Sequence, residues 1–102
     1  MKISLAQVAP GTPFPRLRKL LGPSRARIYA LPEYITAAPG EADQFRTAAH
    51  FSRDLEALCR LSGALGGLLL GGTLVEPADG GLYNTAPTLE DGELVGFQRK
   101  VH

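Results

Sequence analysis

The sequence contains one cysteine, two histidines, no tryptophan and no hydrophobic run long enough to cross a membrane. A single cysteine excludes an internal disulfide framework, and one cysteine with two histidines cannot build a structural zinc site within this chain. Because a membrane-spanning helix needs about 18 consecutive apolar residues, we expect no membrane partner. The first residues also lack the small-residue cleavage site of a secretory signal, which favours a cytoplasmic location.

Acidic residues are absent from the first 32 positions, which carry six Lys or Arg residues. The chain as a whole still has a net charge of only +1, because the remaining residues include more Asp and Glu than Lys and Arg. Five of the basic residues lie between Arg16 and Arg27, and no aromatic side chain is interleaved with them. Nucleic-acid binding surfaces normally combine clustered basic residues with interleaved aromatic ones. We therefore interpret this segment as a solvated basic face with no nucleic-acid partner.

The 102 residues, 44% of them hydrophobic, are enough for one small globular domain or for a part of one. Alternating apolar residues predict strands at 2–8 and 27–31, and Pro32 restricts the end of the second strand to extended geometry. Between these strands, the leucines at 17–21 follow helical spacing. They predict a helix of about two turns, which a Gly-Pro pair ends.

The longest helix is predicted from Asp43 to Ser62, with apolar residues on one side of a helical wheel and charged residues on the other. Cys59 falls in the apolar stripe, which predicts a structural core residue with an inert thiol. His50 and Asp54 fall on the polar face and are expected to form a surface pair. Because Ser52 points toward the apolar side, we predict no Ser-His-Asp triad.

The C-terminal part of the chain is predicted to be β-structure. Residues 68–75 form a nearly continuous apolar run, typical of a strand covered on both faces, in which Gly71-Gly72 marks a bulge or a close approach of another backbone. Strands at 82–89 and 94–101 follow, joined by a hairpin turn at Asp91-Gly92. The three strands should form an antiparallel meander, and the predicted order is β-α-β-α-β-β-β. The glycines form no phosphate-binding motif.

Five short motifs occur in a fixed order along the chain: Gln7 in the first strand, Pro32-Glu33, Tyr83-Asn84-Thr85-Ala86, Asp91-Gly92 and Lys100-Val101-His102. Together they resemble the nitrilase superfamily of carbon-nitrogen hydrolases. The resemblance implies a mixed α/β fold, the four-layer α-β-β-α sandwich, to which this chain contributes one sheet and its two helices. It also implies that residues 1–102 are the N-terminal part of a single carbon-nitrogen hydrolase domain.

In such enzymes a cysteine thiolate attacks carbon, a carboxylate acts as base and a cation stabilises the developing charge. The resemblance implies that Glu33 is the base and Lys100 the electrostatic stabiliser. Glu33 can serve as base near neutral pH only if burial or coupling raises its pKa, which its place after Pro32 would permit. Cys59 matches no nucleophile position of the superfamily. We therefore expect the catalytic cysteine beyond His102, and the 102 residues alone to be inactive.

The resemblance implies a small-molecule amide or nitrile substrate, no cofactor, no metal and a homo-oligomeric parent protein. Hydrolysis and acyl transfer to another acceptor both fit the motifs. Tyr34 and residues 35–42 adjoin Glu33 and are candidates for lining the pocket. An alternative of a different class is a small α+β ligand-binding or regulatory module, in which Glu33 and Lys100 are ordinary surface charges.

Overall fold

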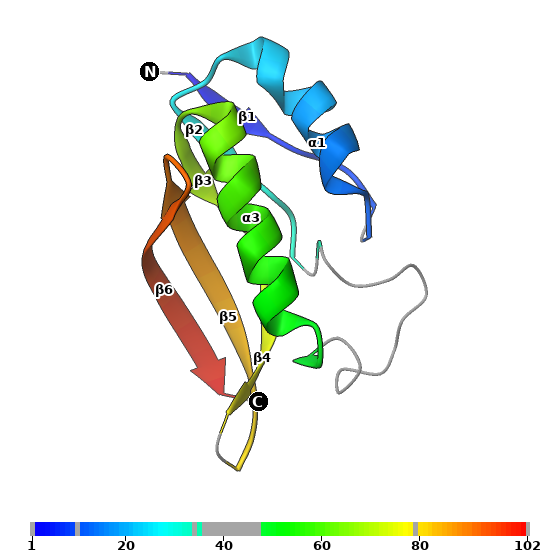
Figure 1. Ribbon diagram of the computed structural model, residues 1–102, viewed down its shortest axis with the longest axis vertical. Coiled ribbons are helices and arrows are strands. Elements are labelled where there is room, and N and C mark those ends of the chain that lie inside the picture. The colour runs from blue at the N-terminus through cyan, green and yellow to red at the C-terminus, as the bar shows by residue number, and fades with distance from the viewer. Residues whose placement is uncertain (1, 10, 34, 36–47, 79, 102) are drawn as a thin grey trace.

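The computed structural model describes residues 2–9, 11–33, 35, 48–78 and 80–101, with the backbone alone at 78, 100 and 101. The described part is a mixed α/β structure in which strands and helices first alternate and three longer strands then follow one another (Figure 1). Its elements are β1 (Ile3–Leu5), α1 (Phe14–Leu21), a short 3₁₀ turn (Gly22–Ser24), β2 (Ile28–Ala30), α3 (Phe51–Leu65), β3 (Leu68–Leu70), β4 (Leu74–Ala78), β5 (Gly81–Glu90) and β6 (Glu93–Val101).

The strands form a single sheet in the order β1-β2-β3-β5-β4, and β6 pairs with the other edge of β5. β1, β2 and β3 are parallel, whereas β5 runs antiparallel to β3, β4 and β6. The predicted antiparallel meander is therefore confirmed. The predicted hairpin is confirmed as well, since Asp91 and Gly92 alone join β5 to β6 and have φ values of 50° and 90°.

The apolar run 68–75 is two strands instead of the single strand predicted. β3 pairs with residues 88–90 of β5 and β4 pairs with residues 81–85, so the two strands follow one another along the same edge of β5. Gly71-Gly72 lies at the break between them. Gly72 has a φ of 73°, and a Cβ there would overlap the carbonyl oxygen of Pro32. Of the two alternatives predicted at these glycines, a bulge or a close backbone approach, the structure shows the close approach.

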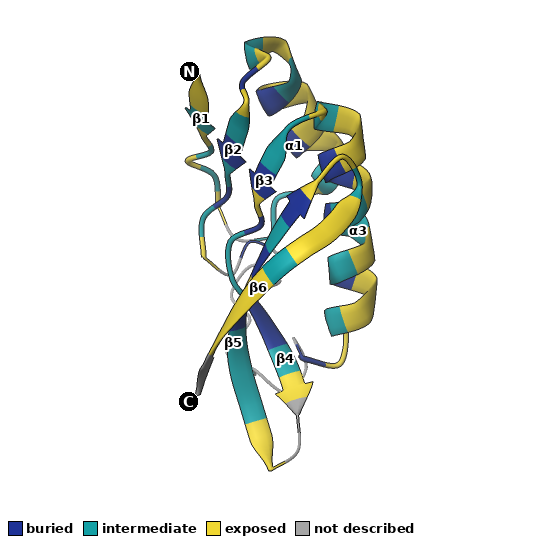
Figure 2. Cartoon of the chain, turned by 90° about the vertical axis from the view of Figure 1, so that its left-hand side faces the viewer, coloured by how far each residue is buried: buried dark blue, intermediate teal, exposed yellow. Residues whose placement is uncertain are grey.

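α1 has the predicted length of about two turns. It follows Pro13, whose backbone is extended, and it buries Leu17 and Leu21 while Leu20 stays exposed. Both helices cover the same face of the sheet (Figure 2). This follows from two successive parallel crossovers, β1-α1-β2 and β2-α3-β3, because both have the same right-handed sense and step in the same direction across the sheet.

α3 begins later and ends later than predicted. Residues 43–47 of the predicted helix lie outside the described residues, and the helix runs on through Gly63, past the predicted end at Ser62. The helix ends at Leu65 because Gly66 adopts the left-handed conformation, with a φ of 73°, and donates its N–H to the carbonyl of Ser62.

The helical wheel assigned two polar residues of α3 to the wrong side. Asp54 is buried, at 6% relative exposure, and accepts hydrogen bonds from Arg53, whereas Ser52 is exposed. The interaction between His50 and Asp54 is the backbone hydrogen bond from the Asp54 N–H to the His50 carbonyl, so the predicted surface pair of their side chains is wrong. The reason is that α3 packs against α1 as well as against the sheet, which widens its buried surface beyond one apolar stripe.

The main core lies between the two helices and the sheet. Cys59 packs against this core as predicted but is only half-buried. The hydroxyl of Ser62 accepts a hydrogen bond from the N–H of Gly92 at 3.1 Å, which connects α3 to the β5-β6 hairpin. The buried hydrophobic residues of this core are Leu17, Leu21, Ala26, Tyr29, Leu31, Ile35, Leu58, Leu61, Leu69, Leu74 and Leu89.

The sheet face opposite the helices carries exposed aliphatic side chains. Ile3, Leu5 and Leu70 are 54%, 70% and 41% exposed, and the register places Leu5 and Leu70 in one cross-strand row. The residues that alternate with them, such as Tyr29 and Leu69, are buried under the helices. Contiguous apolar patches of more than a few hundred Å² are uncommon on monomers.

We expect the 102-residue chain by itself to self-associate through this face. Leu5→Gln combined with Leu70→Gln should shift it toward monomer in sedimentation-velocity measurements. Leu20→Gln is the matched control, because Leu20 is similarly exposed, at 52%, but lies on α1. A wild-type chain that is monomeric and unfolds in one sharp transition would contradict this prediction.

Candidate active site

Glu33 lies where the chain leaves β2 and passes the break between β3 and β4. Beyond β2, Leu31 donates its N–H to the carbonyl of Leu70 at 2.9 Å, and Glu33 then forms an isolated parallel bridge with Thr73. The absence of a side chain at Gly72 allows this approach. The Glu33 side chain is exposed, so the burial that its position after a strand would permit is not found among the described residues.

Lys100 lies near the C-terminal end of β6, where the register pairs it with Asn84 of β5. Asn84 pairs in turn with Val75 of β4, two residues beyond the Thr73 that bridges to Glu33. Positions 33 and 100 are therefore three strand spacings, or roughly 14 Å, apart across the sheet and about two residues, or roughly 7 Å, apart along it. The fold brings them to the same region although 67 positions separate them in the sequence.

The candidate residues Gln7, Tyr34 and His102 are either exposed or outside the described residues. Gln7 is exposed just after β1, which is shorter than the predicted strand 2–8. Tyr34, most of the segment 35–42 and His102 lie outside the described residues. Their proposed places beside Glu33 and Lys100 remain predictions.

Cys59 is remote from this region. Its carbonyl oxygen would lie 3.7 Å from a Cβ at Gly92, so this turn of α3 lies beside the β5-β6 hairpin. Lys100 follows Gly92 by eight residues of strand, or roughly 26 Å. Cys59 therefore cannot attack a group held between Glu33 and Lys100, in agreement with its predicted structural role.

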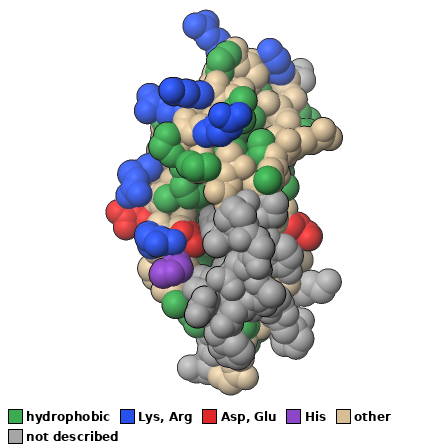
Figure 3. Space-filling view, turned by 90° about the vertical axis from the view of Figure 1, so that its right-hand side faces the viewer, with side chains coloured by type: hydrophobic (Ala, Val, Ile, Leu, Met, Phe, Trp, Pro, Cys, Tyr) green, Lys and Arg blue, Asp and Glu red, His purple; other side chains and the backbone are tan. Residues whose placement is uncertain are grey.

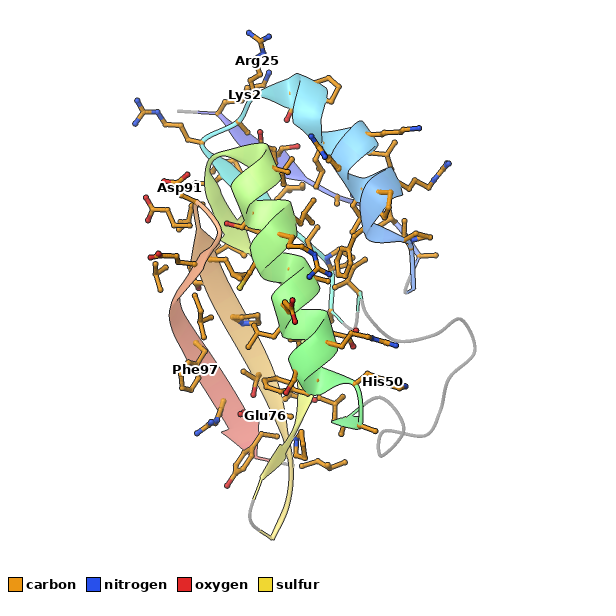
Figure 4. The ribbon with its side chains drawn as sticks, viewed as in Figure 1. Lys2, Arg25, His50, Glu76, Asp91 and Phe97 are labelled. Carbon is orange, nitrogen blue, oxygen red and sulfur yellow. The ribbon has the colours of Figure 1, made fainter. Side chains whose placement is uncertain are left out.

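An ion-pair cluster that the sequence did not reveal lies on the face of the sheet toward α3, as its shared pocket with Phe51 and Leu55 of that helix indicates. Figure 4 labels Glu76 and Phe97 in this region. The guanidinium of Arg99 donates two hydrogen bonds to Glu76, at 2.6 Å and 2.8 Å, and the Thr85 hydroxyl donates a third at 2.7 Å. Arg99 also lies 4.8 Å from the ring centroid of Phe97 and 5.8 Å from that of Tyr83. A small pocket of about 100 Å³ adjoins this cluster.

The cluster shifts the titration of Glu76. Hydrogen bonding from Arg99 holds the pKa of the Glu76 carboxyl below its ordinary value of 4.5, partial burial opposes this, and the Thr85 hydroxyl adds to the lowering. A carboxylate whose folded-state pKa is lowered stabilises the fold above its unfolded-state pKa. That contribution is lost as the pH falls through the folded-state pKa.

We therefore expect Glu76→Gln to lower the thermal midpoint at pH 7, and its difference from the wild type to shrink progressively as the pH falls below about 4.5. Thermal unfolding of the variant and the wild type between pH 7 and pH 3 measures the difference in thermal midpoint and its dependence on pH. Glu56→Gln is the control, because Glu56 forms only an exposed ion pair with Arg60. A Glu76→Gln difference that does not change over this pH range would contradict the assigned cause.

The described residues include no group of three His, Cys, Asp or Glu side chains that could hold a metal ion. None of the described helices is long and apolar enough to cross a membrane. The candidate chemical groups of this region are the carboxylate of Glu33, beyond the end of β2, and the amine of Lys100 on β6, with β4 and β5 between them. A carboxylate can act as a general base, and a protonated amine can stabilise a developing oxyanion.

Comparison with known proteins shows a fold shared with carbon-nitrogen hydrolases. No protein-family profile and no curated protein matches the sequence. A carbon-nitrogen hydrolase from Helicobacter pylori G27 superposes on 98% of this chain with a TM-score of 0.80 at 21% identity. Nit3 of Saccharomyces cerevisiae, a member of branch 10 of the nitrilase superfamily, superposes on 98% with a TM-score of 0.77 at 27% identity.

A glutamine-dependent NAD(+) synthetase from Cytophaga hutchinsonii also superposes on 83% of the chain, with a TM-score of 0.61 at 22% identity. The chain spans 39% of the Helicobacter protein, 44% of Nit3 and 14% of the synthetase. The resemblance stated from the sequence motifs is confirmed at the level of the fold, and the fold is that of part of these larger proteins.

Proposed function

We propose that this chain, which has the fold of the carbon-nitrogen hydrolases, supplies two of three catalytic groups to an enzyme that hydrolyses a small-molecule amide or nitrile. The observation that supports the proposal is that positions 33 and 100, far apart in the sequence, lie three strand spacings apart in one sheet with that fold. Their sequence contexts, Pro32-Glu33 and Lys100-Val101-His102, resemble the catalytic motifs of the nitrilase superfamily. The third group is a cysteine outside these 102 residues.

In the proposed reaction Glu33 accepts the proton of the cysteine thiol, and the thiolate forms a bond to the amide carbon. Lys100 stabilises the negative charge that develops on the amide oxygen. The carbon-nitrogen bond breaks, the leaving amine takes the proton from Glu33, and a thioester remains. Glu33 then removes a proton from water, which attacks the thioester, releases the acid and restores the thiol.

The exposure of Glu33 sets a requirement on this mechanism. Electrostatic interactions and proton transfers in an active site are more effective where bulk water is excluded. The proposal therefore requires that other chain segments or the bound substrate cover Glu33 during catalysis. The backbone bridge to Thr73 holds Glu33 in place while that cover forms.

The test is to trap the thioester in the natural full-length protein. We expect mass spectrometry after exposure to amide substrates to find an acyl group on a cysteine outside residues 1–102. Cys59→Ala should keep turnover within a few fold and cost about 1 kcal/mol of stability, the scale of a small truncation at a partly buried site. An acyl group on Cys59, or a folded Cys59→Ala variant with turnover lost by orders of magnitude, would show that the nucleophile is assigned wrongly.

A further inference from the structure

We infer that the groove between α1 and α3 binds an acidic, amphipathic helical segment of a partner protein. This inference does not depend on the proposed function, because the groove lies on the helical face of the structure and involves neither Glu33 nor Lys100. The groove has a volume of about 860 Å³, and the residues that line it are Phe14, Pro15, Arg18, Lys19, Pro23, Ala57, Arg60, Leu61 and Ala64.

The floor of the groove is apolar because of small residues on α3. Ala57, Leu61 and Ala64 follow i, i+4, i+7 spacing and form one stripe of that helix, while Phe14 lines the groove from α1. Leu61 is buried in the contact between the helices, and the short alanine side chains on either side leave space above the helix backbone.

The length of the groove suits a short helix. The stripe from Ala57 to Ala64 rises by seven residues, or about 10 Å, which corresponds to two turns of an α-helix. A partner helix that lies along this stripe can insert apolar side chains at i, i+3, i+4 and i+7, the usual spacing of helix-in-groove recognition.

Charge complementarity indicates an acidic occupant. Arg18 and Lys19 on α1 and Arg60 on α3 flank the apolar floor, and no Asp or Glu lines it. The described residues place no carboxylate against Arg18 or Lys19. Arg60 pairs with Glu56 at 3.0 Å, but both side chains are about 70% exposed, so this pair contributes little and can be exchanged for a partner carboxylate.

The shape of this face favours a peptide over an anionic membrane surface. Figure 3 shows hydrophobic side chains in the upper part of the molecule with Lys and Arg side chains around them. The cations that line the groove lie beside a recessed apolar floor, which matches a helix with acidic residues beside its apolar stripe.

The experiment uses the natural full-length protein and a fluorescein-labelled probe peptide of about 12 residues, with leucine at i, i+3, i+4 and i+7 and glutamate at the flanking positions. A second peptide carries lysine in place of glutamate. We expect fluorescence anisotropy to show saturable binding of the glutamate peptide and none of the lysine peptide. Binding should weaken as salt is raised, because the flanking charges are exposed.

Two pairs of variants test the location. Arg18→Glu with Lys19→Glu should weaken binding about tenfold or more, whereas Arg16→Glu with Arg27→Glu reverses two exposed charges outside the groove and should have a smaller effect. Ala64→Trp should fill the groove and abolish binding, while Ser52→Trp, at an exposed position elsewhere on α3, should not. Equal effects within either pair would overturn the inference.

Two further outcomes would also overturn it. If phosphatidylglycerol vesicles bind and the Arg18 and Lys19 reversal abolishes that binding while the peptide does not bind, the groove faces a membrane. If Ala64→Trp dissociates an oligomer of the wild-type protein in sedimentation-velocity measurements, the groove is an interface between copies of the chain.

Discussion

Replacing Glu33 by glutamine or Lys100 by alanine in the natural full-length protein is expected to reduce kcat by about 10²- to 10⁴-fold while the protein stays folded. General-base assistance contributes on that scale, and one electrostatic donor contributes about 10²- to 10³-fold. Glutamine keeps the size of Glu33 but cannot accept the thiol proton. Steady-state kinetics of each variant, with circular dichroism to check folding, measure the effect.

The double variant distinguishes catalysis from a loss of structure. If Glu33 and Lys100 act on the same bound thiol and substrate, the combined loss should be far smaller than the product of the two single losses. Glu90→Gln and Lys2→Ala are matched controls at exposed positions outside the candidate site, and both should keep normal turnover. Near-normal turnover of Glu33→Gln or Lys100→Ala would show that the residue is an ordinary surface charge without a catalytic role.

Gly72→Ala is expected to destabilise the protein by roughly 2 to 5 kcal/mol. A positive φ costs a residue with a Cβ about 1 to 2 kcal/mol, and forcing extra atoms into a closely packed place adds about 1 to 3 kcal/mol. At Gly72 both costs apply, since its φ is 73° and the new Cβ would overlap the carbonyl oxygen of Pro32. Urea unfolding of the full-length protein measures the loss.

Gly66→Ala separates the two costs. Gly66 has the same φ of 73°, but a Cβ there would meet nothing within 4 Å. We therefore expect Gly66→Ala to cost only about 1 to 2 kcal/mol, the backbone part alone. Gly72→Ala should also reduce turnover more than Gly66→Ala, because displacement of Pro32 moves Glu33. Equal losses of stability in the two variants would show that the carbonyl oxygen of Pro32 does not exclude a side chain at position 72.

The two helices show what sequence patterns can and cannot predict about a helix. The spacing of leucines and the flanking prolines predicted α1 well, because both ends of the helix depend on local chemistry. α3 was predicted with one apolar face, and Asp54 and Ser52 were placed on the wrong sides. A wheel contains no information on how many neighbours a helix has, and α3 has both α1 and the sheet.

The candidate site shows the same division. The sequence by itself determined the order of elements as far as α3 and the hairpin at Asp91-Gly92, and at Gly71-Gly72 it indicated either a bulge or a close backbone approach. Each of these depends on a residue type whose backbone preference is local, namely proline, glycine or the Asp-Gly pair. The motifs around Glu33 and Lys100 also named both candidate residues without any knowledge of their positions in space.

The register of β6 was decided only by the tertiary structure. At the hairpin Glu90 pairs with Glu93 and Leu89 with Leu94, and continuing that register would place Arg99 opposite Asn84. A shift at Thr88, which leaves Val95 unpaired, places Lys100 there instead. Because side chains alternate between the faces of a strand, one extra residue exchanges the faces of two neighbouring basic positions.

The same shift assigns Arg99 to Thr85, on the face toward α3, where Glu76 binds it. No local pattern in residues 93–101 specifies which of two adjacent basic residues faces the helices. That choice depends on packing of the strand against α3 and on the ion pair with Glu76, both of which join residues far apart in the sequence. The sequence thus determined which residues are candidates, and the paired strands decided which of them share a face.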